Sequence, residues 1–112
     1  MDEHALPRAG EAVLEWAAEW GEPKPRNLRM VATTHEAATQ WIHGPQVGSR
    51  TDRVYFATVQ GAFRKDGRAG EWAAVFVDRA TFRVVTYTVR SRDQAPGRPL
   101  EQLGTVHQLV RP

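Results

Sequence analysis

Trp72-Ala73-Ala74-Val75-Phe76-Val77 is the stretch that decides the fold, because every position in it is apolar. A strand with one wet face alternates apolar and polar residues, so this run predicts a central strand that is buried on both faces. The segments at 54–59 and 83–90 are rich in β-branched and aromatic residues and predict two neighbouring strands. Turn-forming residues separate the three segments, so we expect an antiparallel meander.

Two amphipathic helices are expected before these strands. Residues 11–20 place apolar side chains at helical spacing, and the Gly-Glu-Pro-Lys-Pro segment at 21–25 ends that helix. The apolar side chains are Val13, Trp16, Ala17 and Trp20. Residues 1–10 are expected to be a flexible lead-in.

The second helix has a start signal, an apolar stripe and a stop signal. Thr33 and Glu36 have the spacing of a capping box, which makes Thr33 the expected N-cap. Gly44 and Pro45 then end the helix. The apolar stripe between these signals consists of Ala37, Ala38, Trp41 and Ile42.

The element order predicts an α+β fold: an antiparallel, three- to four-stranded sheet with one or two helices packed on one face. Residues 28–32 are expected to form a short strand or an extended entry, and residues 105–110 a short final strand or an extended tail. One helical turn is expected at 100–103. Gly61, inside the first long strand, indicates a β-bulge or a close approach of another backbone. With 112 residues, the whole chain (1–112) is expected to be a single domain.

Composition excludes several classes of protein. The chain has no cysteine, which rules out disulfide scaffolds, zinc ribbons and thiol nucleophiles. No apolar run reaches the about 18 residues of a membrane span and no secretory signal is visible, so a cytoplasmic protein without membrane contact is expected. The net charge of +2 is small and the basic residues of 64–98 are dispersed, so nucleic acid is not the expected partner.

No constellation of residues indicates a catalytic, metal or cofactor site. His35 and His43 share the second helix at a separation of about 12 Å, which is too far for one metal ion. Neither serine lies in a nucleophile elbow, and the glycines form no phosphate-binding loop. Asp78 begins a tight turn, where an aspartate normally caps backbone amides. We therefore assign no catalytic residue, no metal and no cofactor.

The register of the last hairpin gives the candidate binding face. With Asp78 paired to Arg83, one face is aromatic and is expected to receive the helices; it carries Trp72, Ala74, Phe76, Val85, Tyr87 and Val89. The other face is then open, and we expect a protein or peptide partner, or a second copy of the chain, to cover it. Its candidate binding residues are Val75, Val77, Val84, Thr86 and Thr88. A one-residue shift of the turn would exchange the two faces.

The segment Ala73-Ala74-Val75-Phe76-Val77-Asp78-Arg79-Ala80-Thr81-Phe82-Arg83-Val84-Val85 resembles the PepSY-type hairpin, in which a strand ends in V-D-A-x-T-G before a tight turn. The order of helix, strand and hairpin over residues 33–90 is also similar to that family. Phe82 stands where the family has glycine, which implies a different turn geometry. PepSY-type domains bind and inhibit peptidases without catalytic residues, so the resemblance implies a non-enzymatic binding role.

Three functions are compatible with these features. The first is a small cytosolic domain that binds a protein or peptide without catalysis, favoured by the missing catalytic constellations and the four tryptophans. The second is a small α+β enzyme or ligand-binding protein with a pocket behind a curved sheet, in which Asp78, His35 or Tyr87 would supply acid–base groups. The third is an accessory protein that binds nucleic acid through its arginine-rich half.

Overall fold

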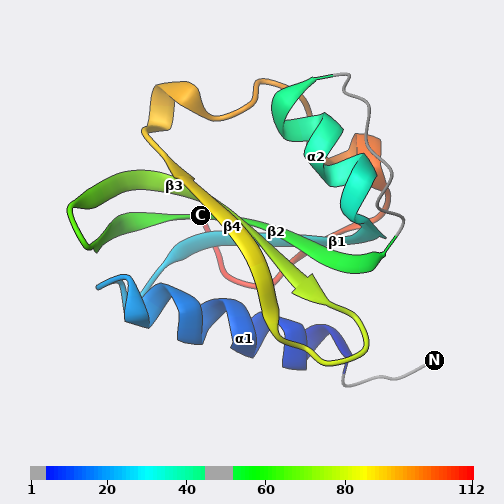
Figure 1. Ribbon diagram of the computed structural model, residues 1–112, viewed down its shortest axis with the longest axis horizontal. Coiled ribbons are helices and arrows are strands. Elements are labelled where there is room, and N and C mark those ends of the chain that lie inside the picture. The colour runs from blue at the N-terminus through cyan, green and yellow to red at the C-terminus, as the bar shows by residue number, and fades with distance from the viewer. Residues whose placement is uncertain (1–4, 45–51) are drawn as a thin grey trace.

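The structure is a computed structural model that describes residues 5–44 and 52–112. This part of the chain contains two α-helices, α1 (Ala5–Glu19) and α2 (His35–His43), and five strands: β1 (Arg26–Thr34), β2 (Arg53–Lys65), β3 (Arg68–Asp78), β4 (Val84–Arg90) and β5 (Val106–Gln108). The strands form one antiparallel sheet in the order β4-β3-β2-β1-β5 (Figure 1). Two short 3-10 helices, η1 (Arg92–Gln94) and η2 (Leu100–Leu103), lie between β4 and β5. The predicted α+β class is confirmed, and the sheet has five strands where three or four were expected.

The two helices cover opposite faces of the sheet (Figure 1). α1 packs Val13 and Trp16 on one face, together with Trp20 just after the helix, and α2 packs Trp41 and Ile42 on the other. We call these the α1 face and the α2 face. The sequence led us to expect both helices on one face. The structure needs two covers because β2 and β3 are buried at successive positions, so both of their sides are apolar.

The N-terminal helix is longer than predicted. α1 begins at Ala5, so the expected flexible lead-in is wrong for residues 5–10, and residues 1–4 lie outside the described part. Ala9 and Gly10 are buried, and a Cβ on Gly10 would stand 3.0 Å from Leu109 Cδ1. Small residues at this turn therefore let the C-terminal segment pack closely against the helix, which orders its first turns.

Thr34, rather than Thr33, caps α2. The Thr34 hydroxyl accepts a hydrogen bond from the Ala37 N–H at 3.2 Å, and its backbone is extended, as an N-cap requires. Thr33 lies within β1 and pairs with Val54. Two adjacent threonines offer the same hydroxyl group, and the strand pairing decides which of them is free to cap. Gly44 ends the helix as predicted, with a φ of 88°.

The β2–β3 hairpin turns at Asp66 and Gly67, whose φ values of 51° and 81° suit a two-residue turn. Gly61 lies inside a register shift of the β2–β3 pairing, which confirms the predicted irregularity. A Cβ on Gly61 would stand only 2.6 Å from Glu22 Cγ. Glu22 Oε1 accepts a hydrogen bond from the Ala62 N–H at 3.0 Å, so the group that approaches Gly61 is a side chain and not another backbone.

The β3–β4 hairpin contains a bulge that reverses the predicted faces. The Asp78 N–H donates to the Arg83 carbonyl at 2.9 Å, so the pairing expected at the turn is present. The register then shifts by one residue between Phe76 and Val77, which leaves Val85 as the extra residue. From residue 86 onward, each β4 residue therefore pairs with a β3 residue that the prediction had placed on the opposite face of the sheet.

The short elements expected at the two ends of the fold are present. The strand alternative is found at both 28–32 and 105–110, as β1 and β5, and the helical turn at 100–103 is η2. Among the described helices, none has the length and apolar content that crossing a membrane requires.

Candidate functional site

The five predicted binding residues do not form one open face. Val75 and Val77 are fully buried in the cluster under α1, and Val84 packs half-buried against the same cluster. Thr86 and Thr88 follow the β4 bulge and pair with residues of the α2 face. The face that was expected to be open is thus covered by α1, because the apolar side of β3 attracts the apolar stripe of that helix.

β4 is an edge strand, and its outer side pairs with no other strand in the described part of the chain. An edge strand presents backbone N–H and C=O groups to which a further strand can bind. Val85 and Tyr87 are 46% and 39% exposed, the highest values among the large hydrophobic residues described. An open backbone edge and exposed apolar side chains therefore occur on the same seven-residue strand.

The middle of β4 is supported by aromatic residues from behind. The Tyr87 ring contacts Trp16 of α1 and Trp20, the residue that follows this helix, with centroid distances of 5.3 Å to each. Phe63 of β2 packs against Trp16 at 5.3 Å. These contacts fix the orientation of the Tyr87 ring and leave its outer side accessible.

Asp78 fixes the turn that precedes β4. Its Oδ1 accepts hydrogen bonds from the N–H groups of Ala80 and Thr81, at 2.8 and 2.9 Å, which confirms the predicted role as a turn cap. The Thr81 and Ala80 N–H groups, in that order, hold the pKa of Asp78 below its ordinary value of 3.8, because they stabilise the charged carboxylate.

Phe82 has a left-handed backbone, with a φ of 58°. A positive φ is the conformation that glycine adopts most readily, so this position of the turn is left-handed although it carries a bulky side chain. The Phe82 ring stacks on Tyr55, and the Arg8 guanidinium lies 4.1 Å from its centre. Contacts from β2 and α1 thus hold a side chain at a position that glycine usually occupies.

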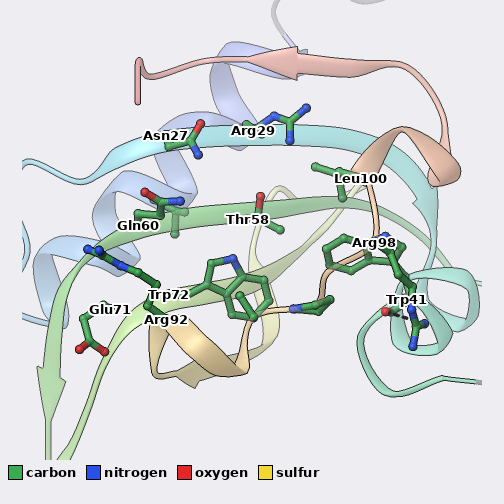
Figure 2. Close-up of a pocket in the computed structure, with 13 residues that line it drawn as sticks. Asn27, Arg29, Trp41, Thr58, Gln60, Glu71, Trp72, Arg92, Arg98 and Leu100 are labelled. Atoms are coloured by element: carbon green, nitrogen blue, oxygen red, sulfur yellow. Dashed lines mark hydrogen bonds between the residues drawn. The ribbon is translucent and has the colours of Figure 1, made fainter.

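A pocket of about 260 Å³ lies on the α2 face. Strands β1, β2 and β3 form its floor, and η1 with the segment that follows it forms a wall (Figure 2). Figure 2 shows Gln60, Arg92 and Trp72 gathered at one end of the pocket and Trp41 and Arg98 at the other. The pocket exists because α2 covers only part of this face and the chain after β4 crosses above the rest.

Three arginines that line the pocket differ in their partners. Arg29 forms an ion pair with Glu101 at 2.6 Å. The backbone N–H of Glu101, and after it the charge of Arg29, holds the pKa of Glu101 below its ordinary value of 4.5. Arg98 donates to two carbonyl oxygens in α2, at 3.0 Å each. The Arg92 side chain is exposed and forms no hydrogen bond or ion pair within the described residues.

The residues suggested for acid–base chemistry do not converge. His35 packs on Phe76 of the α2 face, at a centroid distance of 4.7 Å, whereas Tyr87 packs on Trp16 of α1. Asp78 is occupied by the turn, and none of the three lines the 260 Å³ pocket. In the ranges 5–44 and 52–112, no group of three or more His, Asp or Glu side chains is placed to hold a metal ion.

Reasoning from the sequence missed the pocket because its polar residues are far apart along the chain. Arg29, Gln60 and Arg92 come from β1, β2 and η1 and meet only in the folded sheet. One signal was present: on the α2 face, the second half of β2 changes from apolar residues to Thr58 and Gln60. When one end of a strand is polar on a face that is otherwise apolar, the covering helix is expected not to extend over that end.

Comparisons with known proteins give one partial similarity. DNA ligase 2 of Opitutus terrae is 30% identical to this chain over 74 residues, which are 66% of this chain and 10% of the ligase. The chain thus spans about a tenth of the length of that relative. No family model matches the chain, and no solved structure matches it.

Proposed function

We propose that the chain is a non-catalytic binding module, which takes up an extended segment of another protein as a further strand along β4. The observation that carries this proposal is the unpaired edge of β4 together with the exposure of Val85 and Tyr87. In strand addition, backbone hydrogen bonds supply affinity and side-chain contacts supply specificity. β4 offers both on a rigid aromatic support.

The charges at the two ends of β4 favour a different protein over a second copy of the chain. Arg83 precedes the strand, Arg90 ends it, and the strand itself contains no acidic residue. Antiparallel pairing of two β4 strands would bring the Arg83 end of one beside the Arg90 end of the other, where like charges repel. A partner segment with apolar residues in its middle and acidic residues at its ends complements this edge.

The resemblance to PepSY-type hairpins supports the same proposal. It rests on the segment at 73–85, and the structure places that segment in β3, the turn and the first residues of β4. The resemblance implies binding to another protein without catalysis. Such a role needs no convergent acid–base groups.

A displayed library of short peptides, selected on the folded chain, tests the proposal. Selected peptides should carry apolar residues flanked by acidic ones, and Val85→Glu should weaken their binding about tenfold or more, because the new charge faces the added strand. Leu14→Glu is the matched control, since Leu14 is a large apolar residue of α1, not of β4, with a similar exposure of 38%. Its binding should equal that of the wild type.

Two results would contradict strand addition along β4. One is a library that yields no binder to the folded chain. The other is a set of binders that bind Val85→Glu as tightly as Leu14→Glu, which would place the binding surface elsewhere.

The partial similarity to DNA ligase 2 favours a second candidate, an accessory role on nucleic acid. The exposed arginines of the second half of the chain, among them Arg64, Arg68 and Arg92, would contact phosphates. Binding to single-stranded and duplex DNA should then weaken steeply as salt is raised, because bound counterions are released from the DNA. Absent or salt-independent binding would dismiss this candidate.

A further inference from the structure

We propose that the pocket on the α2 face binds a phosphate group, carried either by a free phosphate ester such as a nucleotide or by a nucleic-acid strand. The pocket is a site of its own. It uses side chains of the sheet floor and of η1, whereas strand addition uses the backbone edge of β4.

The first observation is a set of polar groups that the fold leaves unused. Thr58, Gln60 and Arg92 line the pocket, and their side chains form no hydrogen bond to other residues in the described part of the chain. Thr58 is the buried polar residue of the described core, at 8% exposure. Burying a polar group without a hydrogen-bond partner costs free energy, so a ligand or water that completes these hydrogen bonds stabilises the pocket.

The second observation is the direction from which the donors come. Gln60 and Thr58 rise from β2 on the floor, while Arg92 reaches in from η1 on the wall (Figure 2). A carboxylate is planar and is usually met by donors in one plane, whereas a phosphate accepts bonds from several directions. A guanidinium without an intramolecular partner is the side chain best suited to contact such a group.

The charge of the pocket is positive but not uniformly so. Arg29, Arg92 and Arg98 line it, and Glu71 is the acidic residue of its lining. Arg29 is neutralised in part by Glu101, and Arg98 is held by the carbonyl groups of α2. Arg92 is therefore the cation that remains to attract an anion, and Glu71 opposes it.

The apolar side of the pocket has room for the rest of a ligand. Trp72, Pro96 and Leu100 line it beside the polar groups. Its volume of about 260 Å³ is slightly below the roughly 300–1,000 Å³ of ordinary small-molecule sites. A phosphate with a short organic part, or one nucleotide of a strand, is the size of ligand that it admits.

Titration of the ¹⁵N-labelled chain with adenosine monophosphate, inorganic phosphate, acetate and a single-stranded oligothymidylate tests this inference. The nucleotide should shift the side-chain amide signal of Gln60 and the indole N–H signal of Trp72. Arg92→Gln should raise the Kd for the nucleotide about tenfold, the usual effect of losing a hydrogen bond to a charged group. Glu71→Gln should lower the Kd for the nucleotide, because it removes the negative charge that opposes Arg92. Lys65→Gln also removes one positive charge, from the exposed β2–β3 hairpin, and should change the Kd by less than about twofold.

The probes distinguish the two sources of phosphate. Tighter binding of the nucleotide than of the oligothymidylate assigns a free phosphate ester, and the reverse assigns a strand, provided that Arg92→Gln weakens either one. Oligothymidylate binding that Arg92→Gln and Lys65→Gln weaken equally would overturn the pocket while leaving the accessory role on nucleic acid intact. No shift with any phosphate probe, or equal shifts with acetate, would also overturn it. Because Arg92 is exposed, its replacement should leave the spectrum of the free chain unchanged apart from local signals.

Discussion

Thr34 shows how one hydroxyl group sets the boundary between a strand and a helix. Thr34→Ala removes the acceptor for the Ala37 N–H and should cost about 1 kcal/mol of unfolding free energy. Thr33→Ala is the matched control, because Thr33 is a half-buried residue of β1 that does not cap α2. Urea denaturation of both variants checks this, and equal losses would place the cap in doubt. The sequence predicted that a threonine caps this helix. It did not resolve which one, because the choice depends on how far β1 pairs with β2.

Asp78 predicts a specific response to acid. Its pKa is lower in the folded chain than in the unfolded one, so its charge stabilises the fold fully above about pH 4. This contribution is lost as the pH falls through the folded-state pKa. Asp78→Asn keeps an acceptor oxygen without the charge, so it should be less stable than the wild type at neutral pH. The gap should close on acidification. Denaturation curves at a series of pH values measure the gap, and a gap independent of pH would contradict the capping role.

The β4 bulge is the feature of the strands that the sequence did not reveal. Alternation in β4 is compatible with either register, because Thr86, Tyr87 and Thr88 are tolerated on a half-exposed face. The packing of α1 on Val75 and Val77 selects the observed arrangement, and Val85 is extruded to reach it. The sequence did show that β3 is buried on both sides. A strand that is buried on both sides needs a covering layer on each side, so this observation already implied one helix on each face of the sheet.

Two substitutions to glutamate test this arrangement. Val75→Glu places a carboxylate in the cluster under α1, where Val75 is fully buried. The penalty of several kcal/mol is comparable to the total stability of a small domain, so the chain should unfold. Thr88→Glu puts the same group at a half-buried position on the other face, and that variant should stay folded. Circular dichroism distinguishes the outcomes. A folded Val75→Glu variant would mean that α1 does not cover this face.

At the scale of the whole molecule, two layers of helix enclose a sheet whose β4 edge and polar end remain accessible. The class, the antiparallel meander and the turn at Asp78 followed from local patterns of residues. The two candidate sites could not be predicted from such local patterns, because both depend on contacts between segments that are distant in the sequence. The Tyr87 ring on the β4 edge is supported by Trp16 and Trp20, which are far from it in sequence, and Arg92 meets Gln60 only because the chain after β4 crosses the α2 face.

Hydrogen exchange along β4 tests the central claim, that this edge accepts a further strand. In the free chain, the β4 amides that point away from β3 should exchange rapidly, because they lack a partner strand. Addition of a peptide selected on the wild-type chain should protect these amides and leave the exchange of α2 amides unchanged. Protection that appears on α2 or β5 while the outer β4 amides stay unprotected would contradict the account.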